Sequence, residues 1–124
     1  MEANELRIGN LVGSYNKGEE DRVLTINAQN ILVEAKANKQ GYTRYRPIPL
    51  TEEWLLKFGF MKSKVSSQFD KEKLTIQIAN ELEYHKKGRV YFNSWAILEE
   101  SIKYVHQLQN LYFALTGEEL TIKE

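Results

Sequence analysis

The sequence predicts an α+β protein that is mostly antiparallel β, with a short central helix and an amphipathic C-terminal helix. Three observations support this class. Short segments rich in β-branched or alternating apolar residues, such as 22–37 and 74–79, are separated by polar turns. Two further segments, 50–60 and 104–120, repeat their apolar residues at helical spacing. The loops between the expected strands are too short for parallel crossovers, so we expect antiparallel pairing.

The first half of the chain is expected to be β. In LRIGNLVGSY, the Gly9-Asn10 pair interrupts a strand pattern, which indicates a bulge or a sharp bend. The segment 22–37 predicts two strands joined by a turn at 27–30, because it is enriched in β-branched residues. The segment 42–50 should be extended, since each proline disfavours helical geometry in the residue before it. Together these short strands resemble a small SH3-like barrel or a curled sheet.

The central helix, LTEEWLLKFGF (50–60), carries signals at both ends. Thr51 is expected to cap the N-terminus, and two glutamates follow it where negative charge favours the helix dipole. Gly59 fits the left-handed position that ends a helix, and Phe60 can then fold back on Leu55. We therefore predict about two helical turns.

The segment after this helix is expected to contain further strands, two or three of them antiparallel. KLTIQIAN alternates Leu74, Ile76 and Ile78 with polar or small residues, which predicts a half-buried strand. HKKGR (85–89) is typical of a hairpin turn, and VYFN and WAIL are candidates for the returning strands.

The C-terminal helix is predicted from one apolar stripe. Tyr104, Leu108, Leu111 and Leu115 share a face, and Gly117 stands just past the last periodic residue. Burying the three leucines should contribute several kcal/mol at roughly 0.8 kcal/mol per methylene. We therefore interpret this helix as part of the core.

Composition limits the classes of protein that the sequence allows. The chain has 124 residues, which predicts a single domain over 1–124. Lys plus Arg and Asp plus Glu number 17 each, so a nucleic-acid site would need a local basic patch. The absence of cysteine excludes disulfides and thiolate metal sites. With no leader pattern and no apolar run long enough for a membrane helix, we expect a soluble cytoplasmic protein without a cofactor.

Three blocks carry a resemblance to other proteins. NELRIGNLV (4–12), YRPIPLTEEWLLKFGF (45–60) and IKYVHQLQNLYFALTGEEL (102–120) resemble, in this order, a group of small uncharacterised proteins of Bacteroidetes and of their phages and prophages. The resemblance implies a small bacterial or phage-encoded cytoplasmic protein with an accessory role, such as binding a host or phage component. It implies no activity, cofactor or catalytic residue.

The best candidate for a nucleic-acid site is GYTRYRP (41–47). If this segment is extended, Tyr42, Arg44 and Arg46 project to one side and Thr43 and Tyr45 to the other. Rings that stack on bases and cations that bind phosphate are combined in such sites. The candidate residues are Tyr42, Arg44, Tyr45 and Arg46, with Lys36 and Lys39 nearby in the sequence. The alternative is an ordinary strand with amphipathic side chains.

A second basic cluster lies in the expected 85–89 turn. His85 precedes Lys86, Lys87 and Arg89, and these three cations could contact phosphate. The alternative is a solvated turn that protects an edge strand.

The remaining chemistry-bearing residues are expected to be structural. His106 has Ile102 and Asn110 at i−4 and i+4, which completes no metal pair, so we expect a hydrogen-bonded histidine at the boundary of the core. Gln107, Gln109 and Asn110 are expected to be solvated or bonded to an adjacent edge strand. Trp54 and Trp95 lie within apolar patterns and are expected in the core.

These observations leave three functional hypotheses. Because no catalytic motif is present, the leading one is a non-enzymatic module that binds another protein. The second is a nucleic-acid-binding β domain, and the third is an enzyme with an unfamiliar site. The sequence does not indicate the oligomeric state.

Overall fold

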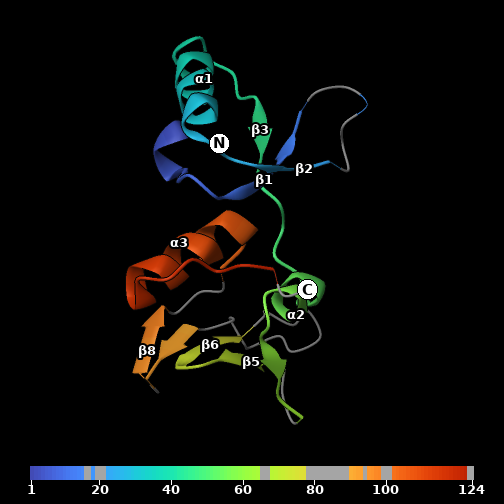
Figure 1. Ribbon diagram of the computed structural model, residues 1–124, viewed down its shortest axis with the longest axis vertical. Helices are drawn as coiled ribbons and strands as arrows, with labels where there is room; N and C mark the ends of the chain where they lie inside the picture. The colour runs from blue at the N-terminus through green and yellow to red at the C-terminus, as the bar shows by residue number, and fades with distance from the viewer. Residues whose placement is uncertain are drawn as a thin grey trace. The chain divides into compact units, whose positions relative to one another are not determined.

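The fold is α+β, as predicted (Figure 1). The computed structural model describes residues 1–15, 18, 22–64, 68–77, 90–93, 95–98 and 102–122. Over these residues it has three α-helices, a short 3₁₀ helix (η1, Ala3–Glu5) and two antiparallel sheets that do not close into a barrel. All of the described helices are too short or too polar to traverse a lipid bilayer.

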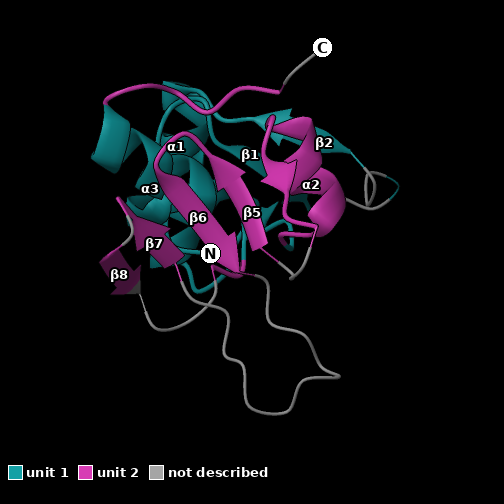
Figure 2. Ribbon diagram, turned by 90° about the horizontal axis from the view of Figure 1, so that it is seen from below, with its two compact units in different colours: residues 1–49, 104–116 teal, residues 50–103, 117–124 magenta. Residues whose placement is uncertain are grey.

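The chain divides into two compact units, coloured separately in Figure 2. Unit 1 contains Met1–Pro49 and Tyr104–Thr116, and unit 2 contains Leu50–Lys103 and Gly117–Glu124. The single domain over residues 1–124 stays a prediction.

Unit 1 is built on a three-stranded sheet of order β2-β1-β3. Its strands are β1 (Leu11–Ser14), β2 (Val23–Thr25) and β3 (Tyr45–Arg46). The inner face of the sheet carries the buried residues Val12 and Tyr45, which form a core cluster with Leu6 and Ile26. The bend expected at Gly9 is confirmed by its positive φ of 97°, and it turns the chain into β1.

Helix α1 (Ala28–Lys39) stands where the sequence predicted a turn and a second strand, so that prediction was wrong. Asn27 and Asn30 form a reciprocal capping box, with each side-chain oxygen accepting the other's backbone N–H at 2.9 Å. This starts a helix at the residues that suggested a turn. The spacing of apolar residues did not predict this helix, because α1 buries the charged residue Glu34 and exposes the apolar residue Leu32.

The C-terminal helix α3 (Val105–Thr116) belongs to unit 1. Of the predicted stripe only Leu108 is buried, while Tyr104, Leu111 and Leu115 are half-buried. The buried face is shifted toward Val105 and Tyr112. The helix is joined to the end of the 42–50 segment, since the Val105 N–H donates to the Ile48 carbonyl at 2.9 Å.

Unit 2 contains a five-stranded sheet of order β4-β5-β6-β7-β8, in which each strand pairs antiparallel with the next. The strands are β4 (Met61–Lys62), β5 (Gln68–Lys71), β6 (Leu74–Gln77), β7 (Val90–Phe92) and β8 (Trp95–Leu98). The predicted alternation is confirmed for Leu74 and Ile76, which are both buried. Ile78 and the 85–89 turn lie outside the described residues.

The short helix α2 (Glu52–Lys57) has the predicted ends. The Thr51 hydroxyl accepts the N–H of Trp54 at 3.4 Å. At the other end, Gly59 has a φ of 88°, and the Phe60 N–H donates to the Leu55 carbonyl at 3.0 Å. This is the Schellman ending that the sequence indicated.

The two tryptophans lie in different surroundings. Trp54 is half-buried against Phe58, with a centroid distance of 5.8 Å. Trp95 is 78% exposed, so its predicted core placement was wrong. It begins β8, the last strand of the described sheet, which has a described neighbour on one side only. An apolar sequence pattern does not distinguish an edge strand from a central one.

Substituting Asn27 with Ala tests the origin of α1. We expect the free energy of unfolding to fall by about 1 kcal/mol, because the Asn30 N–H loses its acceptor. Urea unfolding followed by circular dichroism measures the change. Gln29→Ala, at an exposed position in the same helix, is the control and should change little. An equal effect of both variants would contradict this account of the helix start.

Candidate functional site

The candidate segment 42–46 is held in place by a buried carboxylate. Glu34 of α1 is 0% exposed and accepts four hydrogen bonds from two segments of unit 1, the end of α1 and residues 43–45. Its donors are the Thr43 hydroxyl (2.9 Å), the N–H groups of Arg44 and Tyr45 (3.0 Å each) and the Asn38 side-chain amide (3.2 Å). A buried charge is costly unless its oxygens are bonded in this way. The carboxylate therefore fixes both the backbone and the direction of the segment.

The predicted alternation of side chains along this segment is confirmed. Thr43 points inward to Glu34, and Tyr45 is 8% exposed, with its hydroxyl oxygen accepting from the Asn30 amide at 3.0 Å. Tyr45 is therefore a core residue and presents no ring to a ligand. Tyr42 and Arg44 lie on the opposite, exposed side.

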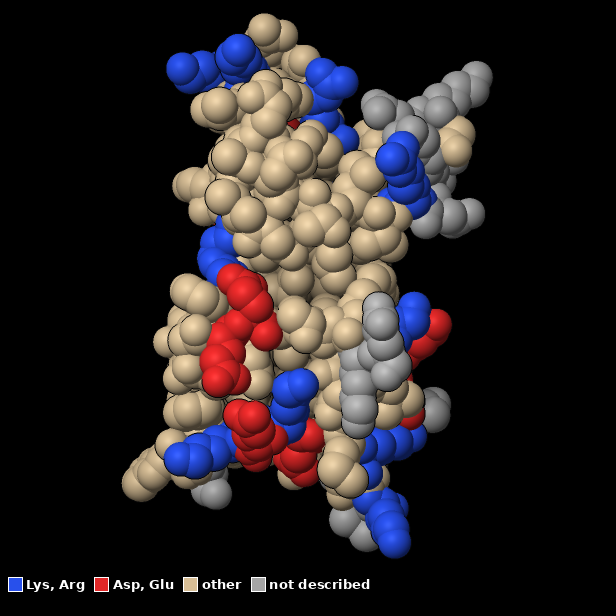
Figure 3. Space-filling view, in the orientation of Figure 1, with Lys and Arg blue, Asp and Glu red and all other residues tan. Residues whose placement is uncertain are grey.

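Two segments contribute exposed residues to this surface. The Tyr15 N–H donates to the Arg44 carbonyl at 3.2 Å, so the exposed Tyr15 lies opposite Arg44 across the β1–β3 pair. The Tyr42 N–H donates to the Ala37 carbonyl at the end of α1 at 3.1 Å. Lys36 and Lys39 are exposed on the last turn of α1, on the side of the helix opposite Glu34, and therefore do not share this surface. Figure 3 shows Lys and Arg atoms over α1 and β3, with hardly any Asp or Glu atoms there.

The other predicted cations are placed differently. Arg46 is half-buried, and its guanidinium lies so close to Gly13 that a Cβ there would meet Nε and Nη2 at 2.9 Å. Arg46 is thus packed on the sheet and is less available to a ligand than Arg44. Lys86, Lys87 and Arg89 lie outside the described residues.

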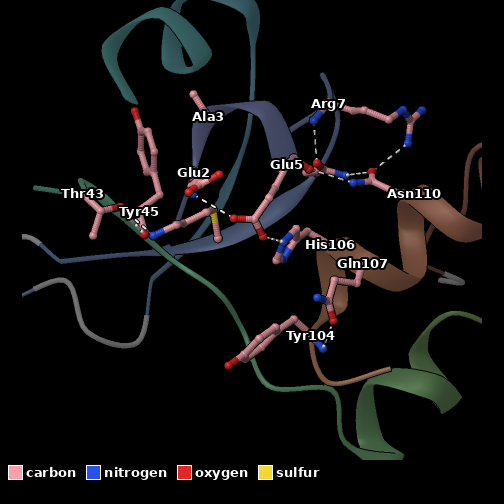
Figure 4. A network of polar contacts seen from close by, with 12 residues as sticks. Glu2, Ala3, Glu5, Arg7, Thr43, Tyr45, Tyr104, His106, Gln107 and Asn110 are labelled. Atoms are coloured by element: carbon pink, nitrogen blue, oxygen red, sulfur yellow. Dashed lines mark hydrogen bonds and ion pairs between the residues drawn. The ribbon is translucent and has the colours of Figure 1, made fainter. Parts of the chain in front are cut away.

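His106 is buried, as predicted, and not open to a substrate. It is 1% exposed, its Nε2 lies 3.4 Å from Oε1 of Glu5, and its ring stacks on Tyr104 at a centroid distance of 6.0 Å (Figure 4). Its Nδ1 has no hydrogen-bond partner among the described residues. The contact with Glu5 needs a hydrogen on Nε2, because a carboxylate oxygen can only accept.

Two neighbouring amides of α3 connect this helix to the N-terminal segment. Gln109 accepts the Leu11 N–H at 2.8 Å and donates to the Gly9 carbonyl at 3.1 Å. Asn110 donates to the Glu5 carbonyl at 2.9 Å and accepts from Asn10 at 2.8 Å. Gln109 therefore bonds to β1, which is the central strand of its sheet and not the edge strand that was expected.

The sequence did not reveal that Arg7 and Asn10 join this network. Arg7 Nη1 donates to the Asn110 side-chain oxygen at 3.1 Å, and the Arg7 guanidinium carbon lies 4.0 Å from the centroid of the Phe113 ring (Figure 4). The bend at Gly9 was the available signal, since a bend leaves backbone groups that need polar partners.

Unit 2 offers a different kind of surface at the two edges of its sheet. At one edge, β4 has only two residues, and Lys62 pairs with Glu52 at 2.8 Å. At the other edge, β8 begins with three exposed residues of low polarity: Trp95, Ala96 and Ile97.

Comparison with known proteins identified no relative of this chain. No protein family model matches the chain, and neither curated proteins nor solved structures gave a match. Within the described residues, no group of three or more His, Cys, Asp or Glu side chains could hold a metal ion.

Replacing Glu34 with Gln should destabilise the protein strongly. One side-chain oxygen becomes an NH₂ group that must face N–H or O–H donors, and we expect a loss of about 3 kcal/mol. Urea unfolding measures it. Glu53→Gln removes an exposed carboxylate that pairs with Lys57 in α2, and it should cost less than about 0.5 kcal/mol. Equal losses would show that Glu34 does not organise the 43–45 segment.

The Glu5 carboxylate gives a prediction of pH dependence. The hydrogen bond from the Glu2 N–H lowers the pKa of Glu5 below its ordinary value of 4.5, partial burial opposes this, and His106 adds to the lowering. Its stabilising contribution is therefore complete above pH 4.5 and is lost as the pH falls through the lowered pKa. Glu5→Gln should reduce the loss of stability on this acid side, as measured by unfolding across pH. An unchanged acid limb would contradict this.

Proposed function

We propose that the protein is a non-enzymatic interaction module that binds an extended segment of another protein along β8. The observation that carries the proposal is Trp95, which is 78% exposed on the last described strand of its sheet. Tryptophan dominates many interfaces because one buried ring contributes a large apolar area. Ala96 and Ile97 continue the exposed, weakly polar surface along the same strand.

The contrast between the two edges of the sheet supports strand addition as the binding mode. Proteins protect sheet edges with very short strands and charged side chains, especially lysine. The β4 edge has both features, in a two-residue strand that contains Lys62. The β8 edge has four residues and no charge. An extended peptide can pair with such an edge through its backbone, while side-chain contacts provide specificity.

The buried ionisable groups support a role without chemistry. Glu34 is occupied by four donors inside unit 1, and His106 is buried against Glu5. The Glu34 carboxylate and the His106 imidazole both stabilise the fold of unit 1, although enzymes often use such groups in catalysis. With the resemblance of the 102–120 block, we place the protein among cytoplasmic accessory proteins of Bacteroidetes or their phages.

Trp95→Thr tests this proposal, since threonine keeps strand propensity and removes the ring. Immobilised protein is incubated with lysate of a Bacteroidetes host, and captured proteins are quantified by mass spectrometry. We expect a protein captured by the wild type to be lost by at least tenfold with Trp95→Thr. Met61→Thr, at a 76% exposed residue on the β4 edge, should retain it.

Two outcomes would count against this function. The first is capture of the same proteins at the same levels by the wild type and Trp95→Thr. The second is an equal loss with Met61→Thr, which would indicate general stickiness of exposed apolar residues. Thermal unfolding of both variants confirms that they are folded.

A further inference from the structure

The five-stranded sheet of unit 2 carries one continuous row of side chains on the face turned away from its core. The core face is marked by Phe69, Ile76 and Val90, which pair across β5, β6 and β7 and are all buried (Figure 2). On the other face, strand pairing joins one residue of each strand into the row: Met61, Asp70, Thr75, Tyr91 and Ala96. The two ends of this row are exposed, and its three central residues are half-buried.

The centre of the row presents hydrogen-bond acceptors. The Thr75 hydroxyl donates its hydrogen to Oδ1 of Asp70 at 2.6 Å, and the Gln68 side-chain amide donates to the same oxygen at 3.4 Å. The Thr75 oxygen therefore offers lone pairs only, and Oδ2 of Asp70 accepts no hydrogen bond from a described residue. Asp70 also forms no ion pair within the described ranges. A ligand at this place must donate hydrogens, and a positive charge on it would complement the carboxylate.

Tyr91 adds an aromatic ring beside these acceptors. Thr75 stands between Asp70 and Tyr91 in the row and is shorter than both. Neighbouring strands lie about 4.8 Å apart, so a cation held by Asp70 above Thr75 can come within the roughly 6 Å of a ring at which cation–π attraction acts. The Tyr91 side chain makes no hydrogen bond or ring contact with the residues described. We propose that Asp70, Thr75 and Tyr91 bind the guanidinium group of an arginine side chain from a protein partner.

Arginine fits this arrangement better than lysine does. A guanidinium group is planar, so it can donate two parallel N–H bonds to one carboxylate while its face stacks on an aromatic ring. The lysine ammonium is a more strongly hydrated point charge. An ion pair at a half-exposed surface binds a free small molecule with a dissociation constant of about a millimolar or weaker. The arginine is therefore expected to be one residue of a larger protein surface.

The site lies on the face of the sheet, so the proposal does not depend on strand addition at the β8 edge. It is tested on the intact, isotope-labelled chain by NMR titration. The probe is N-acetyl-arginine amide, which has a peptide group on each side as an arginine within a protein has. We expect saturable shifts of the Asp70, Thr75 and Tyr91 amide signals at millimolar concentrations, weakening as salt rises. The lysine analogue should bind more weakly. The citrulline analogue, which keeps the shape without the charge, should give no saturable shift.

Four variants separate the contributions of charge and ring. Asp70→Asn keeps an oxygen that accepts from Thr75 but loses the charge, and it should weaken binding about fivefold or more. Tyr91→Leu should weaken binding about two- to fivefold, whereas Tyr91→Phe keeps the ring and should retain the affinity. Glu72→Gln removes the same charge from the exposed turn between β5 and β6 and should leave the affinity unchanged. Thermal unfolding shows which variants are folded, and Asp70→Asn decides the question if Tyr91→Leu is not.

Four results would overturn the inference. They are no shift of the three amide signals, equal binding of the arginine and citrulline analogues, and equal weakening by Asp70→Asn and Glu72→Gln. The fourth is tighter binding of a free alkylguanidine such as agmatine than of the blocked arginine, which would assign the site to a small molecule. Retained Trp95-dependent protein capture alongside any of these results would leave the proposed function intact.

Discussion

The carboxylate of Glu34 is the constraint on which the order of unit 1 depends. A buried charge needs hydrogen bonds to its oxygens, and here the donors come from the end of α1 and from residues 43–45. Satisfying this requirement brings the segment after the helix back against it. It also sets which side chains along β3 face inward, and β3 in turn pairs with β1 at Ser14 and Tyr45.

A second polar network connects parts of unit 1 that lie about a hundred residues apart in the sequence. Gln109 bonds the backbone on both sides of Asn10 and thus acts there as a neighbouring strand would. Asn110 gathers Arg7, Asn10 and the Glu5 carbonyl at the next position of the helix. Apolar burial stabilises the packing of α3 within unit 1. The directional hydrogen bonds fix which residues of the N-terminal segment lie beside Gln109 and Asn110.

The elements that could be predicted are those whose signals lie within a few residues. The Thr51 cap, the Gly59 stop and the alternation of Leu74 and Ile76 are local, and the structure confirms them. Helix α1 was missed because its inward residue is Glu34, whose burial makes sense only with partners further along the chain. At the candidate site, the alternation of 42–46 was predictable, whereas the contribution of Tyr15 required the pairing of β1 with β3.

The distribution of chemical groups between interior and surface supports the proposed binding function. Groups that could transfer protons, such as Glu34 and His106, are inside and hold the backbone or the helix in place. Three large aromatic side chains are exposed instead: Trp95, Tyr42 and Tyr15. Exposing such rings to water is unfavourable for an isolated protein, because moving apolar surface out of water lowers the free energy. Under the proposed function, the exposed Trp95 ring is one side of a contact that a protein partner completes.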